Sequence, residues 1–235
     1  MSERDLVGDS SRVLDTLADG GVGIIPLDVA YAIIGNSEAA IRKIFTAKNR
    51  SFEKPSGMFS NWDLFNDIQI VGQKERDMVR CVTIDNNLPM SSVAPFKADH
   101  PMYKNVDPFV LANSSKAGTI DMLMNAGEIH NELTRQSMER GVPVFGSSAN
   151  TSLQGSKYRL EDIEAPVREA ADLELDYGLS KYHNPEGRSS SIIDLRDFKT
   201  IRVGVCYDQI CDLLLKNFDV DLKAIGTAGE RAALA

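Results

Sequence analysis

Three cationic side chains stand close together in one short polar segment of this chain. Lys48 and Arg50 are separated by one residue, and Lys54 follows four positions after Arg50. Arginine presents a planar fork of donors and lysine a compact positive charge, and both are common partners of phosphate groups. Cations also gather at the C-terminal end of a helix because the helix dipole favours them there. Seen alone, a solvated group of charges is the simpler explanation, and a polyphosphate site is the alternative.

A hydroxyl and an amide follow a short apolar segment later in the chain. Residues 142–145 predict a strand, and Ser148 and Asn150 come shortly after it. In α/β folds, ligands are commonly held by polar groups just beyond strand ends. A plain turn is the simpler explanation of such a pair.

A third candidate region combines glycine, serine and arginine. Residues 187–194 hold a glycine and three serines, including Ser190, and Arg202 lies on the next predicted strand. Hydroxyl and backbone N–H groups hydrogen-bond phosphate oxygens, and arginine pairs with them. The alternative is an ordinary serine-rich entry into a strand.

The elements that position these residues are expected to alternate between helices and strands. Helices are predicted where apolar residues recur at helical spacing, and strands where short apolar runs end in polar residues or turn formers. The predicted helices are residues 10–20, 37–48, 128–140, 160–171 and 209–218, and the predicted strands are residues 22–27, 119–124, 142–145, 190–195 and 200–205. Residues 86–118, rich in Pro, Asn, Asp and Ser, predict a long excursion from one domain.

This alternation without an internal repeat predicts an α/β or α+β fold, in which helices flank a twisted mixed β-sheet. A chain of 235 residues suffices for one large domain with one core. We place an N-terminal helix at residues 1–19, the domain at residues 20–215 and a C-terminal tail at residues 216–235.

The composition is that of an ordinary globular protein with an acidic balance. Hydrophobic residues make up 43% and charged residues 26% of the chain, which argues against a disordered protein. The net charge of −8 argues against a surface devoted to nucleic-acid backbones. Any site for an anion must therefore be local.

Metal and membrane sites are not expected. The three cysteines and three histidines are scattered, so we predict no metal site. The N-terminus lacks the layout of a signal peptide, and the best apolar run, residues 22–27, is too short to span a bilayer. We expect a cytoplasmic protein without membrane association, and the sequence leaves its oligomeric state open.

Taken in order, these segments resemble the Sua/YciO/YrdC family of threonylcarbamoyl-adenylate synthases. The matching segments are residues 20–32 with the family's glycine, strand and PTDTVYG opening, 48–55 with KxRP…KP, 148–150 with SxN, 187–194 with GxxSTVVD, and 201–204 with LRxG. No single motif is specific, but five in the same order are. The resemblance extends from about residue 20 to residue 215 and implies a YrdC-like single domain.

The resemblance also implies an activity and its residues. Enzymes of this family combine L-threonine, bicarbonate and ATP into threonylcarbamoyl-AMP, with release of pyrophosphate, as the first step towards the threonylcarbamoyladenosine base of tRNA. By resemblance, Lys48 and Arg50 would be catalytic, and ATP would bind in the company of Mg²⁺, for which we see no dedicated protein cage. The nucleotide would further contact Lys54, Ser148, Asn150, Ser190 and Arg202, and the substrate pocket would hold Asp28 and Tyr31.

The chain departs from the family on one side of the pocket. Leu27 and Val29 replace two threonines of the opening motif, Ala32 replaces a glycine, and Leu123 occupies a position where the family has an arginine. A site built to hydrogen-bond threonine loses that ability when its polar groups become apolar. We therefore expect a divergent member that binds ATP and combines it with bicarbonate or another carbamoyl donor and with an amino acid or analogue. The expected product is threonylcarbamoyl-AMP or, with a changed co-substrate in place of threonine, an analogue of it.

Two other functions stay open at this point. One is a binding module for a nucleotide or for double-stranded RNA, against which the acidic balance counts. The other is a catalytically inactive relative that serves as a partner or regulator, which the same replacements would also produce.

Overall fold

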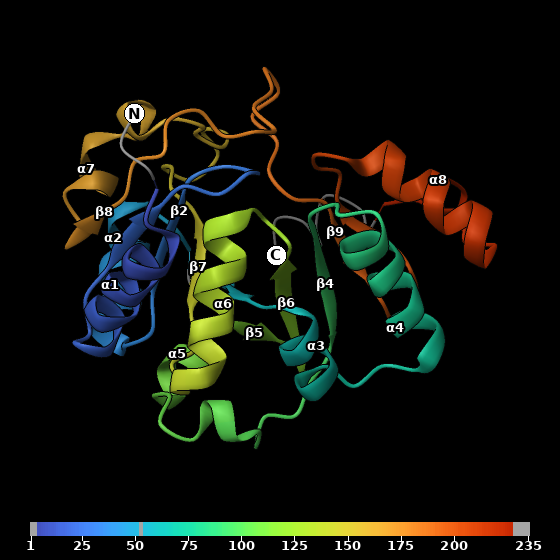
Figure 1. The fold of residues 1–235 in the computed structure, drawn as a ribbon, viewed down its shortest axis with the longest axis horizontal. Coiled ribbons are helices and arrows are strands. Elements are labelled where there is room, and N and C mark those ends of the chain that lie inside the picture. The colour runs from blue at the N-terminus through green and yellow to red at the C-terminus, as the bar shows by residue number, and fades with distance from the viewer. Residues whose placement is uncertain (1–3, 52–53, 228–235) are drawn as a thin grey trace.

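The centre of the molecule is a twisted β-sheet with helices on both of its faces (Figure 1). The computed structural model describes residues 4–51 and 54–227. In that part of the chain the sheet has ten strands in the order β10-β9-β4-β6-β3-β7-β2-β1-β8, with β5 paired to β6 at the side. The strands are β1 (Gly23–Ile25), β2 (Ala32–Gly35), β3 (Gly57–Phe59), β4 (Met90–Pro95), β5 (Ser115–Lys116), β6 (Thr119–Met124), β7 (Phe145–Ser148), β8 (Leu173–Glu174), β9 (Ile192–Asp194) and β10 (Thr200–Arg202).

The sheet is mixed, as the sequence predicts. The pairs β1 with β8, β3 with β6 and β4 with β9 are parallel, and the other pairs are antiparallel. Parallel pairs require long crossover connections, and helices supply most of them. The helices are α1 (Leu6–Ala18), α2 (Glu38–Ala47), α3 (Trp62–Ile68), α4 (Gln73–Arg80), α5 (Pro108–Ala112), α6 (Glu128–Arg140), α7 (Ala165–Arg168), α8 (Tyr207–Phe218) and α9 (Leu222–Ile225).

One half of the sheet is buried between two groups of helices. Because successive side chains of a strand point to opposite faces, Ile33 and Ile34 of β2 join different hydrophobic clusters. Ile33 packs with α2 residues such as Ile44, whereas Ile34 packs with Leu14 of α1 and Leu133 of α6. Figure 1 shows α1 and α6 side by side over this half of the sheet.

The other half of the sheet has helices on one face and a cavity on the other. Met90 of β4, Met124 of β6 and Ile193 of β9 are buried in one cluster with residues of α3, α4 and α8. The alternate residues Ser91, Leu123 and Ile192 point to the opposite face and line the cavity. This alternation positions the candidate site.

Several elements differ from the sequence-based predictions. Strand β2 was not predicted, because its short, wholly buried sequence carries no alternation. Residues 86–118 were predicted to form a long excursion, but they contain β4, which lies inside the sheet between β9 and β6. Its buried serines can lie there because their hydroxyls find hydrogen-bond partners. The hydroxyl of Ser92 donates to Oε1 of Gln69 over 2.8 Å. Residues 160–171 form one 3₁₀ turn (Leu160–Asp162) and the short α7 rather than one long helix.

In the described part of the chain, the segments near both ends form helices that pack against the rest of the domain. Helix α1 packs along α6. The segment predicted as a C-terminal tail, residues 216–235, begins with the last turn of α8 and contains α9. Residues 228–235 of that tail lie outside the described part of the chain. None of the helices in residues 4–51 and 54–227 is long and apolar enough to cross a membrane.

Candidate functional site

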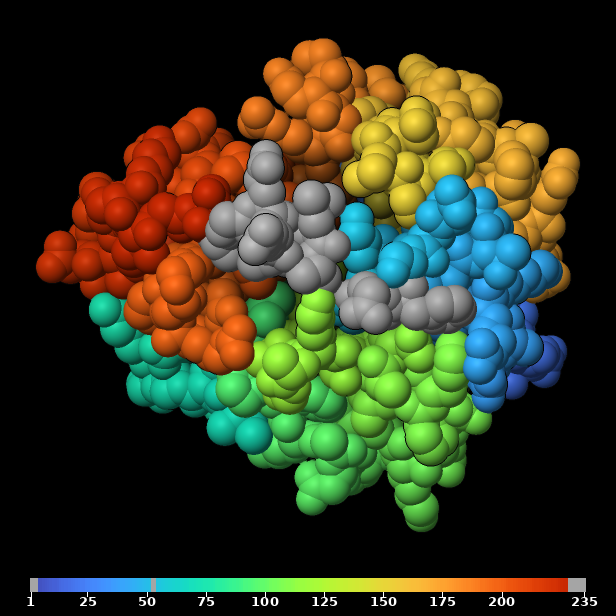
Figure 2. Space-filling model, turned by 180° about the vertical axis from the view of Figure 1, so that it is seen from behind, coloured from blue at the N-terminus to red at the C-terminus, as the bar shows by residue number. Residues whose placement is uncertain are grey.

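A cavity of about 610 Å³ lies on the open face of the sheet. Its floor is formed by β9, β4, β6 and β3, and its walls by β7, the opening loop after β1 and the segment that follows α2. In the view of Figure 2, segments that are far apart in the sequence, coloured cyan, green, yellow and orange, meet on this side of the molecule.

Cations outnumber carboxylates in the lining of this cavity. Among the described residues the lining contains the cations Arg50, Lys54, Lys116, Arg196 and Arg202 and the carboxylates Asp121 and Asp194. Asp194 is already held by Arg196, with Nη2 2.6 Å from Oδ2 and Nε 2.9 Å from Oδ1. The lining of the cavity therefore carries an excess of positive charge, which suits an anion.

Arg50 is fixed by the backbone of its own loop. Its Nε donates to the carbonyl of Lys54 over 3.0 Å and its Nη2 donates to the carbonyl of Pro55 over 2.7 Å. Burial, and secondarily the charge of Arg202, lowers the pKa of Arg50 to about 10, so the guanidinium is still charged at neutral pH. Among the described residues these two bonds to carbonyls are the hydrogen bonds that the Arg50 side chain donates, and its other N–H groups could donate to a ligand in the cavity.

Arg202 and Ser190 form the facing wall. Nε of Arg202 donates to the carbonyl of Ser190 and Nη2 donates to its hydroxyl, both over 2.9 Å. The Ser190 hydroxyl also lies 3.3 Å from the hydroxyl of Ser91 on β4. Gly204 permits this close approach, because a Cβ at that position would lie 2.2 Å from the carbonyl oxygen of Ser189.

Lys48 does not line the cavity, although it was predicted beside Arg50. It is 1% exposed, and its Nζ donates to the carbonyls of Ser148 and Asn150, the latter over 2.6 Å. Burial, and then the nearby Arg50, lowers the pKa of Lys48 to about 7. Its position makes it a brace between the end of α2 and the loop that follows β7.

The two residues of the SxN segment also separate. Ser148 lines the cavity, whereas Asn150 is buried outside it. The Nδ2 of Asn150 donates to the carbonyl of Thr151 over 2.7 Å, and its Oδ1 has no hydrogen-bond partner among the described residues.

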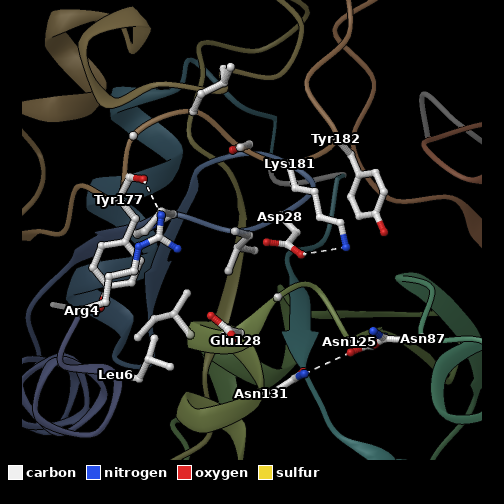
Figure 3. Close-up of a pocket in the computed structure, with 17 residues that line it drawn as sticks. Arg4, Leu6, Asp28, Asn87, Asn125, Glu128, Asn131, Tyr177, Lys181 and Tyr182 are labelled. Atoms are coloured by element: carbon white, nitrogen blue, oxygen red, sulfur yellow. Dashed lines mark hydrogen bonds and ion pairs between the residues drawn. The ribbon is translucent and has the colours of Figure 1, made fainter. Parts of the chain in front are cut away.

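Asp28 and Tyr31, predicted for the substrate pocket, have different surroundings. Asp28 lines a second hollow of about 430 Å³, shown in Figure 3, where its Oδ2 lies 3.9 Å from Nζ of Lys181. Burial raises the pKa of Asp28. Tyr31 lines the first cavity, of about 610 Å³, which we call the cationic cavity. Its hydroxyl is already engaged, because it lies 2.7 Å from Oδ1 of Asp176 and 2.9 Å from the carbonyl of Gly178.

The structure thus gathers six of the nine predicted site residues around one cavity. These are Tyr31, Arg50, Lys54, Ser148, Ser190 and Arg202. Lys48 and Asn150 lie behind its wall, and Asp28 faces the second hollow. Contact of any of these residues with a ligand stays a prediction.

One side of the cavity is apolar. Leu27, Val29, Phe59 and Leu123 line it and belong to one hydrophobic cluster, and we call these four residues the apolar corner. Their side chains offer no hydrogen-bond donor or acceptor, so this part of the cavity can contact only an apolar part of a ligand.

Sequence analysis missed Asp121, Lys116 and Arg196. The signal for Asp121 was available, because a carboxylate between apolar residues of a predicted strand must face away from the helices or be buried at a cost. Burial raises its pKa to about 6, against the opposing effects of Arg202, Ser91 and Arg50. Lys116 and Arg196 carried no such signal, since Lys116 lies in the two-residue edge strand β5 and Arg196 lies in a polar turn.

Comparison with known proteins places this fold. The family model named Sua5/YciO/YrdC and described as telomere recombination matches residues 15–204. Among solved structures, a hypothetical protein of Streptococcus mutans is 18% identical, with a TM-score of 0.75, over 88% of this chain and 91% of that protein. Escherichia coli YciO is 19% identical, with a TM-score of 0.63, over 84% of this chain and 90% of YciO.

A third structure, P. abyssi Sua5 complexed with L-threonine, is 21% identical, with a TM-score of 0.65 over 86% of this chain. The chain spans 56% of that Sua5 protein. Structural likeness at such identities shows the fold alone, and no curated protein matches the sequence. The match of the family model over residues 15–204 confirms the resemblance of the motifs, and the chain belongs to the Sua5/YciO/YrdC family.

Proposed function

We propose that the protein is an ATP-dependent nucleotidyltransferase that forms a carbamoyl-adenylate and releases pyrophosphate. The observation that carries the proposal is the cationic cavity, which brings Arg50, Lys54, Ser148, Ser190 and Arg202 together from four separate segments. Membership of a family that includes threonylcarbamoyl-adenylate synthases supports the same activity.

The chemistry requires little more than position and charge. An amine and bicarbonate give a carbamate with loss of water, and a carbamate oxygen then attacks the α-phosphorus of ATP while pyrophosphate leaves. The transfer depends on holding the two reactants in line and on neutralising the triphosphate, so no covalent nucleophile is needed. Arg50, with its fork fixed by two backbone carbonyls, would hold and neutralise phosphate oxygens, and Mg²⁺ would accompany them.

The co-substrate in this proposal differs from threonine. P. abyssi Sua5 has been solved in complex with L-threonine, but here the apolar corner presents Leu27, Val29 and Leu123 to the ligand. An apolar surface cannot bind the carboxylate and hydroxyl of threonine, and it leaves those groups desolvated. The co-substrate is therefore an amine or amino acid analogue with an apolar part directed at this corner.

RNA binding is the weaker candidate. The cations that line the cavity are gathered in one hollow of a chain with net charge −8, whereas binding to a duplex requires cations along an extended face. The apolar corner also permits a protein that binds a nucleotide without catalysis. The experiment below separates this alternative from the proposed nucleotidyltransferase.

Calorimetric titration of the protein with ATP and Mg²⁺ tests the proposal, with pyrophosphate release measured in parallel. We expect ATP to bind, and threonine with bicarbonate to leave pyrophosphate release unchanged, whereas apolar amines with bicarbonate raise it. Threonine-dependent turnover at an enzyme's rate would contradict the changed co-substrate. ATP binding without turnover for any amine would indicate the non-catalytic relative, and absence of ATP binding would contradict the whole proposal.

A further inference from the structure

Asp121 places a carboxylate on the floor of the cationic cavity. It lies on β6, opposite Val93 of β4, and shares the cavity face with Leu123 two residues later. A Cβ on Gly57 of the neighbouring strand β3 would lie 3.4 Å from its Oδ2. Glycine at position 57 thus leaves the side of this carboxylate uncovered.

Among the described residues no arginine or lysine forms an ion pair with this carboxylate, and the hydroxyl of Ser91 is the side-chain hydrogen-bond donor that helps to lower its pKa. The Oδ1 of Asp121 is buried without a hydrogen-bond partner among the described residues. Arg50 and Arg202 act on it only through their charge, because the bonds that the structure gives them go to backbone carbonyls and to Ser190. A carboxylate accepts up to about four hydrogen bonds or metal contacts, so Asp121 has ligand capacity to spare.

A triphosphate in this cavity would meet Asp121 as a like charge. Arg50, Lys54 and Arg202 attract phosphate groups towards the same floor that carries the carboxylate. Two anions in one partly dry site repel each other unless a cation lies between them. Mg²⁺ suits that place, because it takes oxygen ligands and is commonly held by one or two protein carboxylates together with substrate phosphates and water.

We propose that Asp121 is the protein ligand of a Mg²⁺ ion that this cavity shares with the phosphates of its nucleotide. The inference rests on the proposed function, because the phosphates complete the site. Among the described residues no three acidic, histidine or cysteine side chains come together, so a metal site of the protein alone is not available there. A shared site needs only one carboxylate at the phosphates.

The test compares ATP affinity with Mg²⁺ and with EDTA in three proteins. In the wild type we expect Mg²⁺ to strengthen ATP binding at least tenfold. In the Asp121→Asn variant, which keeps the shape of the side chain, we expect that ratio to fall below about threefold, while metal-free ATP binds more tightly because the repulsion is gone. The control is Asp194→Asn, which removes a carboxylate of the same cavity that Arg196 already holds, and its ratio should match the wild type.

Three outcomes decide the matter. An unchanged Mg²⁺ ratio in Asp121→Asn would overturn the inference while leaving the proposed function intact. Tighter ATP binding by the same factor with and without Mg²⁺ would show that Asp121 only repels phosphate, and would also overturn it. Absence of ATP binding in every protein and condition would overturn the proposed function itself. Circular dichroism checks the fold of each variant, and Asp121→Ser replaces Asp121→Asn if the latter does not fold.

Discussion

Two neighbouring cations of the sequence take opposite roles at the scale of residues. Lys48 ends with its charge buried against two carbonyls, and Arg50 turns its guanidinium into the cavity. Burying an ammonium group costs free energy that hydrogen bonds only partly offset, which is why the pKa of Lys48 falls to about 7. Asn150, which accepts from Lys48 through its carbonyl, is then part of the same brace rather than of the cavity.

The buried Lys48 makes stability depend on pH. Between the folded pKa of about 7 and the ordinary lysine value of 10.5, the unfolded chain binds one more proton than the folded protein. The free energy of unfolding therefore rises with pH in this window. From pH 7 to pH 9.5 we expect the wild type to gain about 1–3 kcal/mol relative to Lys48→Met, which has nothing to titrate at this position. Urea unfolding of both proteins at each pH measures this difference, and parallel pH profiles would contradict it.

At the scale of elements, β6 and the loop after β1 decide which side chains line the apolar side of the cavity. Alternation along β6 sends Asp121 and Leu123 to the cavity, and the loop after β1 adds Leu27 and Val29 across the strand ends. One strand thus supplies both a carboxylate, Asp121, and an apolar side chain, Leu123, to the same cavity.

Restoring polar groups to the apolar corner should change the co-substrate. The triple variant Leu27→Thr, Val29→Thr and Leu123→Arg supplies two hydroxyls and a cation where the wild type has none. We expect threonine with bicarbonate to raise pyrophosphate release at least tenfold above the wild-type response, because the carboxylate of threonine gains a charged partner, and hydrogen bonds to charged groups are worth about 1.5–3 kcal/mol each.

Leu123→Met is the matched control, since it keeps an apolar side chain of similar volume. Its response to threonine should equal that of the wild type. If the triple variant folds, binds ATP and still ignores threonine, the apolar corner does not select the co-substrate.

At the scale of the whole molecule, the cavity connects parts of the sheet that have separate hydrophobic clusters. The strands β7 and β2 belong to clusters with α1, α2 and α6, and β4 and β9 to the cluster with α3, α4 and α8. A nucleotide that contacts Ser148 on one side and Arg202 on the other would bind only the folded arrangement of both parts. Its binding energy then adds to the stability of the entire domain.

Thermal unfolding should report this linkage. At a concentration of ATP one hundred times its Kd, with Mg²⁺, stabilisation is about 2.7 kcal/mol, which corresponds to roughly 5–10 °C in a domain of this size. Arg50→Ala should weaken ATP binding about tenfold or more and reduce the shift at the same ATP concentration.

Arg42→Ala is the control for that variant, because Arg42 lies on the exposed side of α2 and pairs with Glu38 instead. Its ATP-dependent shift should equal the wild-type shift. An equal loss of the shift in both arginine variants would mean that general charge, and not the cavity, binds the nucleotide.

Much of this protein could be predicted from the sequence. The mixed sheet follows from the alternation of apolar runs and helical patterns, and the order of five short motifs identifies the family, because these signals are local. Strand β4 was not predicted, because consecutive serines are typical of a loop. Their hydrogen-bond partners, Gln69 and Ser190, lie outside the local sequence and become visible only in the fold.

The sequence by itself determined the family, the fold class and most of the polar and charged residue types that line the cavity. Only the tertiary structure decided which of the predicted residues line the cavity. It shows that Arg50 faces the cavity while Lys48 does not, that Asn150 lies behind the wall, and that Asp121 lies on the floor. The physical reason is that burial and direction depend on contacts across long stretches of chain. Lys48 is turned inwards by two carbonyls about one hundred residues away, and no pattern near Lys48 records their position.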